Sequence, residues 1–519
     1  MKQLSWLCMG LLWACNPSQK TISEATKPVT QHADPKVWAQ TITEAELKTH
    51  LYVYASDEFE GRETGQPGQK KAVDYIVEAY KKIGIQPLQP NNYIQKVPLE
   101  EAYLPQGKIT FSGKTFDIGN GFVGFDALQA SFDQLVYVGY GIDDDQYTNY
   151  EELDVAGKIV LIKAGEPQDE QGNYILSGTK EKTKWSNPSE SIGMRVENAA
   201  KHGAKAVFLV DGKNYPRFKN RFDYYKRKGG GQMDLKSAGN DGPATFYISA
   251  EMAKALYVDY EQSDASKILN QNIEFDVKSS NKDIDSENVA ALIKGSEKPN
   301  EYIIISSHLD HIGKTADGQI NNGADDDGSG TVALLEIAEA FKKAKDQGQG
   351  PKRSIIFLHV TGEEKGLLGS RYYTDVEPLV PLSETVANLN IDMIGRIDPK
   401  YKGDRNYLYL IGSDKLSTEL HELSEAVNKE FCQIEFDYTY NDENDPNRFY
   451  YRSDHYNFAK NNIPIIFYFN GTHADYHAPS DTADKINYDL LENRTRLIFH
   501  TAWEIAEREN RLVVDKASK

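Results

Sequence analysis

Short apolar runs, each ending in polar or charged residues, recur along the chain from residue 288 onward. The predicted strands are 302–306, 354–360, 386–391 and 463–469. The segment 331–343 carries apolar residues at the spacing of one helix face, and it is the clearest predicted helix. Strands that alternate with helices in this way predict an α/β fold for this half of the chain.

The first half of the chain has two further patterns. Residues 68–82 carry apolar side chains at helical spacing, and Gly84 follows them, as is typical of a helix C-terminus. The next predicted strands are short, at 135–139, 158–162 and the end of 199–210, and long loops connect them. Because 519 residues exceed the size at which a single hydrophobic core usually stops growing, we expect two domains or one domain with a large insertion.

Composition and charge exclude one class of partner. The chain has 59 basic and 78 acidic residues, a net charge of −19, which argues against binding to nucleic acid. The stretch 213–228 is an exception because basic and aromatic residues alternate there, but three glycines follow it, and we interpret it as an exposed loop. A hydrophobic fraction of 39% and a charged fraction of 26% are typical of a compact soluble protein.

The first residues have the pattern of an export signal. Lys2 precedes a short apolar run that ends in Ala14 and Cys15, and this run is too short to span a bilayer. The pattern resembles a bacterial lipoprotein signal at residues 1–15, with Cys15 as the acylated residue. We therefore expect a periplasmic or outer-membrane lipoprotein, with ordinary secretion as the alternative. Residues 16–35 are rich in Ser, Thr, Lys and Pro and predict a flexible tether.

Side chains that can bind metal follow four of the predicted strands and open the predicted helix. They are His308 and Asp310, Asp325 to Asp327, Glu363 and Glu364, Asp392, and Asp475 and His477. In an open α/β sheet, ligands bind outside the carboxyl ends of the strands, so we expect these residues to converge. A mixed set of imidazoles and carboxylates suits zinc, whereas calcium prefers more oxygen ligands and no histidine. The sequence therefore predicts a zinc site at this edge of the sheet.

These motifs, in this order, resemble metallopeptidase family 28, whose members are co-catalytic two-zinc peptidases. The turn 61–65, with the sequence Gly-Arg-Glu-Thr-Gly, resembles the family as well. The resemblance implies a central, mostly parallel mixed sheet flanked by helices, with an inserted β-rich protease-associated domain. The implied peptidase domain covers 36–125 and 263–519, and the implied insertion covers 126–262.

The same resemblance implies two zinc ions and a set of five ligands. The implied ligands are His308 and Asp392 for one ion, Glu364 and His477 for the other, and Asp326 as the bridge between the two. Three aspartates are consecutive here, and the Gly-Ser-Gly sequence that follows them favours Asp326 as the bridge. Asp327 is the alternative.

Residues beside the ligands have expected roles in catalysis. A water between two zinc ions still needs a base to take its proton and deliver it to the leaving amine, and Glu363 is our candidate, as the family also implies. Asp310 is placed to accept the ring N–H of His308 and fix its tautomer. Tyr476 and Arg452 stand where similar secreted aminopeptidases have donors for the oxyanion of the tetrahedral intermediate.

Other residues near the motifs have simpler interpretations. His359 lies inside an apolar strand, and we expect it to be a core residue. Arg452 has an alternative role as the partner of Asp454 in a surface ion pair. Three histidines are candidates for contact with substrate or with a ligand's neighbours, but not for metal binding: His311, His455 and His473.

The expected function is an aminopeptidase that removes N-terminal residues from peptides. A carboxypeptidase or dipeptidase on the same scaffold is one alternative, because Arg452 offers a cation for a substrate carboxylate. A glutaminyl cyclase, which works with one zinc ion, is another. The complete set of ligands disfavours a surface binding module without catalysis. The expected partners are peptide substrates, with no nucleic acid, and with membrane contact only through the lipid at Cys15.

Overall fold

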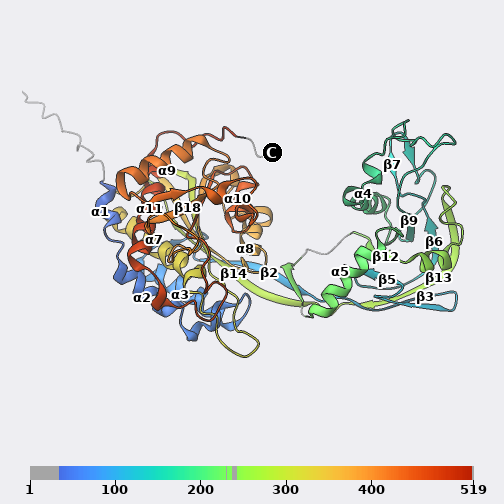
Figure 1. Cartoon of the computed structure of the whole chain (residues 1–519), viewed down its shortest axis with the longest axis horizontal. Helices are drawn as coiled ribbons and strands as arrows, with labels where there is room; N and C mark the ends of the chain where they lie inside the picture. Colours follow the sequence, from blue (N-terminus) through green and yellow to red (C-terminus); the bar gives the residue numbers. More distant parts are fainter. Residues whose placement is uncertain (1–33, 230, 237–241, 517–519) are drawn as a thin grey trace, which may run out of the picture.

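The computed structural model describes residues 34–229, 231–236 and 242–516. Within these residues the chain forms two bodies, each with its own sheet, joined by long strands (Figure 1). The larger body holds the N-terminal helices and the C-terminal half of the chain, and residues between them build the smaller body. The smaller body is therefore an insertion within the larger one.

A mixed ten-stranded sheet forms the centre of the larger body. Its strands are β1 Gln86–Pro87, β2 Ile94–Ala102, β11 Gln232–Leu235, β14 Lys282–Ile293, β15 Lys298–His308, β16 Arg353–Val360, β17 Thr385–Ile391, β18 Tyr407–Ile411, β19 Glu435–Asp437 and β20 Ile465–Phe469. Their order is β11-β2-β14-β16-β15-β17-β20-β18-β19, with β1 beside β14. The central strands β16, β15, β17 and β20 are parallel. The four strands predicted between residues 302 and 469 are confirmed as these four, and with them the α/β fold.

Helices cover both faces of this sheet. They are α1 Pro35–Ala39, α2 Glu44–Tyr54, α3 Pro67–Ile83, α7 Gly330–Asp346, α8 Leu368–Arg371, α9 Thr418–Phe431, α10 His455–Ala459 and α11 Tyr488–Glu507. Side chains alternate across a strand, so Ile303 and Ile305 of β15 join the core beneath α2, α3, α7 and α11, whereas Ile304 packs in the core with α10. The predicted helices 68–82 and 331–343 are confirmed as α3 and α7, and Gly84 ends α3 with φ of 81°.

The smaller body has an eight-stranded sheet and cores of its own. Its elements are β3 Gln106–Phe111, β4 Lys114–Asp117, β5 Phe122–Gly124, β6 Leu128–Tyr137, β7 Asp143–Asp144, β8 Tyr147–Thr148, β9 Ile159–Lys163, α4 Pro188–Lys201, β10 Ala206–Val210, α5 Tyr215–Lys228, β12 Ala244–Ile248, α6 Ala250–Leu256 and β13 Lys267–Lys278. The sheet order is β4-β3-β13-β6-β9-β10-β12-β5, and β7 pairs only with β8. The strands β6, β9, β10 and β12 are parallel. The apolar clusters on this sheet share no residue with the main core of the larger body.

The insertion is longer than the predicted 126–262. Its sheet begins at Gln106 with β3 and ends at Lys278 with β13, because β13 pairs with both β3 and β6. Few residues of β13 are buried, so the sequence has no apolar run that marks this strand. In addition, β11 lies inside the predicted range but pairs with β2 of the larger sheet.

The stretch 213–228 is a helix, so its prediction as an exposed loop is wrong. Pro216 stands in the first turn of α5, where a missing N–H costs no helical hydrogen bond. Phe222 is buried, and the ring of Phe218 stacks on Tyr247 with centroids 3.9 Å apart. Phe218 and Phe222 thus lie on the packed side of the helix, whereas Tyr224 is exposed, as are most of the basic residues.

The export signal predicted at residues 1–15, with Cys15, lies outside the described residues and stays a prediction. Only the last two residues of the predicted tether 16–35 are described. Asp34 caps helix α1 with its side chain, and Pro35 is the first residue of that helix. Among the described residues, no helix combines the length and the apolar character that a bilayer crossing requires.

Candidate metal centre

The candidate site lies where the parallel strands of the larger sheet end. His308 is the last residue of β15, Glu363 and Glu364 follow β16, and Asp392 follows β17. His477 lies in the loop after β20. Neighbouring parallel strands end at the same edge of a sheet, so these residues converge although they are far apart in sequence.

The turn before α7 brings Asp326 into the middle of this group. Asp326 Oδ1 lies 3.2 Å from Nε2 of His308, and Asp326 Oδ2 lies 3.1 Å from Nε2 of His477. His308 Nε2 also lies 3.7 Å from Asp392 Oδ1, and His477 Nε2 lies 3.2 Å from Glu364 Oε2. The structure therefore arranges the five predicted ligands as two groups that share Asp326. The first group is Asp326 with His308 and Asp392, and the second group is Asp326 with Glu364 and His477.

The three consecutive aspartates have different partners. The Asp327 carboxylate accepts backbone N–H groups at 2.9, 3.1 and 3.2 Å. One oxygen of Asp325 accepts a backbone N–H at 2.7 Å, and the other lies 3.1 Å from both Asn470 and His473. Asp327 also lies near the first group, but its oxygens already accept hydrogen bonds. Asp326 is therefore the aspartate whose oxygens remain available to a cation.

The first group is buried and strongly negative. His308 is 1% exposed, Asp326 3% and Asp392 8%. Burial opposes a charge on His308, but the nearby carboxylates, Glu363 foremost, outweigh burial and raise the pKa of this imidazole well above its usual value. His308 Nε2 and Asp326 Oδ2 have no hydrogen-bond partner among the described residues. A cation in the first group would satisfy His308 Nε2, and a cation in the second would satisfy Asp326 Oδ2, so these residues fit a metal centre.

The second group has the same electrostatic character. Burial lowers the pKa of His477, but its contacts with Asp326 and Glu364 raise that pKa to about 10. Burial raises the pKa of Asp326, but the surrounding imidazoles outweigh burial and hold it well below the usual value. Metal ligation requires neutral imidazoles, so a metal bound here would displace protons from the histidines.

Asp310 contacts His308 as predicted and has a further role beside it. His308 Nδ1 lies 3.0 Å from the backbone carbonyl oxygen of Asp310 and 3.8 Å from its carboxylate. The carbonyl is the closer acceptor, so Asp310 accepts the ring N–H of His308 through its backbone oxygen rather than through its carboxylate. The Asp310 carboxylate instead accepts the Thr64 hydroxyl at 2.7 Å and the backbone N–H of Glu363 at 3.2 Å. Asp310 therefore holds the backbone of the predicted base in place.

Glu363 faces a small hollow beside the two groups. The hollow measures about 30 Å³, which is enough for a water molecule, and Asp326 and Asp392 border it too. Burial raises the pKa of the Glu363 carboxyl well above its usual range, and the charges of Asp392 and Glu364 add to the shift. A carboxyl group in this position can exchange a proton with a water in the hollow.

The two predicted oxyanion donors border the same hollow. Tyr476 stacks on His477 with ring centroids 3.8 Å apart, and burial raises the pKa of its hydroxyl, which therefore stays a donor. The Arg452 guanidinium lies 5.0 Å from the ring centre of Phe449 and has no ion-pair partner in the described part of the chain. The alternative surface ion pair with Asp454 is wrong, because Asp454 is buried and accepts a serine hydroxyl.

The turn 61–65 supports the loop that carries Asp326. Arg62 is buried and donates to two backbone carbonyls of the loop 322–326, at 2.7 and 2.8 Å. Gly61 has φ of 70°, and a Cβ at this position would lie 2.5 Å from a backbone carbonyl oxygen. This turn therefore acts on the site through the backbone beside Asp326.

Two further residues contact the ligands: His311, a predicted candidate for a contact beside them, and Ser453, which the sequence did not indicate. His311 is buried, and its Nδ1 lies 2.9 Å from Glu364 Oε1 and 3.7 Å from Asp326 Oδ2. Its signal in the sequence is its position directly after the His-x-Asp motif. Ser453 donates to Asp392 Oδ2 at 2.6 Å, and no motif marks it.

His359, His455 and His473 lie outside the two groups. His359 is a core residue as predicted, with Nε2 2.7 Å from the Tyr80 hydroxyl, and burial lowers its pKa to about 3. His455 Nε2 lies 2.8 Å from a backbone carbonyl oxygen. His473 contacts Asp325, next to the shared aspartate, at 3.1 Å.

One segment of the chain matches a known protein family. Residues 288–502 match the family described as peptidase family M28. A probable glutamate carboxypeptidase of Arabidopsis thaliana is 37% identical over 106 residues, which are 20% of this chain and 14% of that protein. Leucine aminopeptidase 1 of Sclerotinia sclerotiorum is 28% identical over 225 residues, which are 42% of this chain and 55% of that protein. The chain thus spans about half or less of the length of these relatives.

Solved structures resemble the chain over most of its length. An aminopeptidase from Aneurinibacillus has 21% identity and a TM-score of 0.46, covering 93% of this chain and 99% of that one. A zinc aminopeptidase from Bacillus subtilis has 19% identity and a TM-score of 0.45, covering 91% of this chain and 97% of that one.

Proposed function

We propose, because residues 288–502 belong to peptidase family M28, that this chain is a zinc-dependent aminopeptidase. The family match confirms the resemblance that the motifs indicated. The observation that carries the activity is the convergence of five imidazole and carboxylate side chains in two groups that share Asp326. All five lie within the matched segment. The name of the leucine aminopeptidase relative supports cleavage at the N-terminus of a peptide.

Two zinc ions are the proposed cofactors. The proposed ligands are His308 and Asp392 for one ion, Glu364 and His477 for the other, and Asp326 for both. When bound, the ions would acidify a water and polarise the scissile carbonyl. His311 contacts the free side of Glu364 and orients this ligand.

Glu363 is the proposed general base and acid. It borders the water-sized hollow, takes a proton from the attacking water and delivers that proton to the leaving amine. Asp310 holds the Glu363 backbone through its N–H. Tyr476 borders the same hollow and donates its hydroxyl to the oxyanion.

A carboxypeptidase is the second candidate activity. It is supported by Arg452, which borders the hollow without an ion-pair partner in the described part of the chain, and by the name of the Arabidopsis relative. Arg452→Gln separates the two activities. As an oxyanion donor of an aminopeptidase, Arg452 supports hydrolysis of leucine p-nitroanilide, which has no carboxylate, so this reaction should slow about tenfold or more in the variant. A large loss on N-acetylated dipeptides with a free carboxylate would favour the carboxypeptidase instead.

Glu363→Gln tests the proposed mechanism. Leucine p-nitroanilide hydrolysis should fall by about 10³-fold while zinc content stays at two ions per chain. Glu58→Gln, at an exposed glutamate, is the control and should be fully active. Retained activity of Glu363→Gln would remove the proposed base. A zinc content near one in the wild-type protein would favour a glutaminyl cyclase.

We also propose export and a lipid anchor at Cys15, in the periplasm or outer membrane. The support is the sequence of residues 1–15, with Lys2 before a short apolar run and Cys15 after a small residue. Cys15→Ser should abolish incorporation of labelled fatty acid and move the protein from the membrane to the soluble fraction. Unchanged labelling would contradict the anchor.

A further inference from the structure

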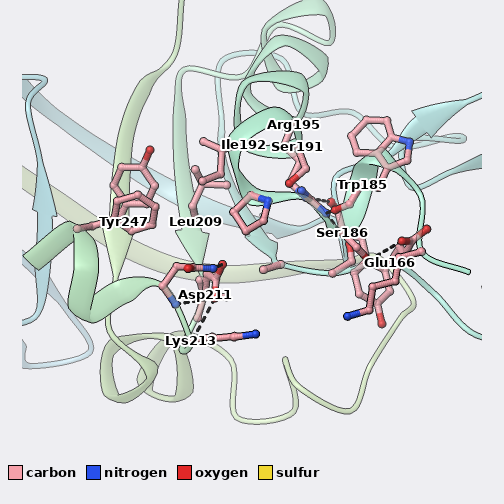
Figure 2. A pocket seen from close by; sticks show the side chains of 18 of the residues that line it. Glu166, Trp185, Ser186, Ser191, Ile192, Arg195, Leu209, Asp211, Lys213 and Tyr247 are labelled. Atoms are coloured by element: carbon pink, nitrogen blue, oxygen red, sulfur yellow. Dashed lines mark hydrogen bonds between the residues drawn. The ribbon is translucent and has the colours of Figure 1, made fainter. Parts of the chain in front are cut away.

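A second hollow, of about 450 Å³, lies in the smaller body (Figure 2). Gly165 and Glu166, which follow β9, border it, and so does Asp211, which follows β10. β9 and β10 are parallel neighbours, and the edge where such strands end is the usual ligand site of an open sheet. The lining residues run from 140 to 247, outside the segment that matches the peptidase family.

Helix α4 presents two hydrogen-bond donors to this hollow, from Ser191 and Arg195. Arg195 is 2% exposed, and its Nε and Nη2 donate to backbone carbonyls, including that of Tyr140 at 2.7 Å and that of Trp185 at 3.0 Å. In the described part of the chain, Arg195 Nη1 and the Ser191 hydroxyl have no hydrogen-bond partner, and neither is sealed from solvent. The hollow therefore has two donors available for a ligand.

The carboxylates around the hollow are already satisfied. Glu166 accepts the backbone N–H of Thr183 at 2.9 Å, the Thr183 hydroxyl at 2.7 Å and the Ser186 hydroxyl. Asp211 accepts the backbone N–H of Asn214 at 3.0 Å and its side-chain amide at 2.7 Å. The unused hydrogen-bonding capacity is thus of donor type, and it calls for a ligand that accepts.

The charge of Arg195 also favours a ligand that accepts hydrogen bonds, and an anion in particular. Burial lowers the pKa of its guanidinium to about 10, although Asp211 and Glu166 act against this shift. The group is therefore still charged at neutral pH, and no carboxylate forms an ion pair with it in the described residues. A buried cation without a direct counterion is costly, and a bound anion would remove that cost.

The other end of the hollow is apolar and aromatic. Figure 2 shows Tyr247 and Leu209 at one end and Glu166 and Ser186 at the other. Phe218 borders the apolar end and stacks on Tyr247 with ring centroids 3.9 Å apart. A ligand that fills the hollow must therefore combine an anionic group with an apolar group.

We propose that this hollow binds the C-terminal residue of a peptide, with its carboxylate at Arg195 and Ser191 and its apolar side chain against Tyr247 and Phe218. The volume of about 450 Å³ lies in the range of sites for small organic ligands. A phosphate dianion fits less well, because Glu166 and Asp211 repel a second negative charge. Phosphate would also leave the aromatic end of the hollow unoccupied. The binding does not depend on the proposed catalytic activity.

Calorimetric titration of the full chain with N-acetyl-Ala-Phe tests the proposal. The acetyl group blocks the N-terminus, so this probe is not a substrate for an aminopeptidase. We expect saturable binding of the acid and at least about tenfold weaker binding of the C-terminal amide, which lacks the charge. Equal affinity for acid and amide would overturn the proposal, as would displacement of the peptide by inorganic phosphate at the same concentration.

Variants locate the binding in the hollow. Arg195→Gln should abolish it, and Ser191→Ala, which leaves the carbonyl contacts of Arg195 intact, should weaken it about three- to tenfold. Lys182→Gln, at an exposed lysine on the rim, should weaken it more than Lys180→Gln, at an exposed lysine away from the rim. Glu363→Gln should bind the probe like wild type. Unchanged binding by Ser191→Ala and Arg195→Gln would overturn the assignment.

Discussion

The two hollows occupy equivalent places in their sheets but have opposite chemistry. Each lies outside the ends of parallel strands, one at β15, β16 and β17 and the other at β9 and β10. At the first, carboxylates face one another, and Asp326 Oδ2 has no hydrogen-bond partner among the described residues. At the second, the carboxylates are hydrogen-bonded, and the buried Arg195 keeps one N–H group without a partner in the described part of the chain. The fold therefore supplies the position of a site, and the residues after the strands determine the charge of its ligand.

At both sites, hydrogen bonds within the protein distinguish the residue that we assign to binding from the neighbouring residues that stabilise the surrounding structure. Asp325 and Asp327 flank Asp326, but backbone N–H groups occupy them. Glu166 and Asp211 flank Arg195 and are occupied in the same way. Among the described residues, Asp326 Oδ2 and Arg195 Nη1 are atoms without hydrogen-bond partners, and we assign each to the ligand of its hollow.

Asp326→Asn should produce the largest effect. The loss of the charge shared by both groups should lower kcat/KM by about 10³-fold or more, and zinc content should fall from two ions towards one. Asp327→Asn is the matched comparison, because it disturbs backbone hydrogen bonds and should lower the melting temperature of the metal-free protein. Metal analysis, leucine p-nitroanilide hydrolysis and thermal melts measure these outcomes. Two zinc ions in Asp326→Asn would contradict the assignment.

Asp310→Asn should have a smaller effect on the same site. It weakens the acceptor for the N–H of Glu363, so kcat should fall about 10- to 100-fold with little change in KM. Thr64→Val removes the hydroxyl that donates to Asp310, and it should also lower kcat with little change in KM. Zinc content should stay at two ions in both variants. Loss of zinc would show instead that Asp310 acts on the His308 ligand.

Separate cores predict separate responses of the two bodies. The main cluster of the larger body shares no residue with those of the smaller body, so we expect two transitions in scanning calorimetry. A chelator should lower one transition by about 5 °C or more, and N-acetyl-Ala-Phe should raise only the other. If both ligands moved the same transition, the two sites would not be independent.

Glu336 in α7 is a buried carboxyl that belongs to neither proposed ligand site. Its substitution should have the smallest of the predicted effects. It is 1% exposed, and its oxygens have no hydrogen-bond partner among the described residues. Burial raises its pKa to about 8, and burial also lowers the pKa of the His50 imidazole, 3.6 Å away, so that this histidine is neutral at pH 8. The unfolded carboxyl ionises at lower pH, so stability is present below its ordinary pKa and is lost as pH rises to about 8.

Glu336→Gln should therefore melt at a higher temperature than wild type at pH 8, and the difference should shrink at pH 5. Glu339→Gln is the control, because Glu339 is partly exposed and pairs with Lys343 at 3.0 Å. It should show no such dependence on pH. An equal difference for Glu336→Gln at both pH values would contradict the raised pKa.

The sequence predicts well what a local pattern encodes. β16, β17 and β20 are buried along their length and β15 is buried over its second half, so these strands are rich in apolar residues, and polar residues follow them. The five candidate ligands follow these runs or open the next helix, so their convergence could be expected from strand order alone.

What depends on tertiary contacts could not be predicted. Few residues of β13 are buried, and its pairing with β3 and β6 defines it, so its sequence has no strong apolar run. The carbonyl of Asp310 and its carboxylate compete for His308, and only the backbone path decides which one is nearer. Ser453 reaches Asp392 from another loop, and no spacing in the sequence encodes that contact.

Anomalous scattering at the zinc edge, from crystals of the protein grown with zinc, tests the central claim most directly. We expect two peaks, one beside His308 and Asp392 and the other beside Glu364 and His477. Asp326 should contact both ions at about 2.0 to 2.2 Å. A single peak, or a pair bridged by Asp327 with Asp326 turned away, would contradict the account.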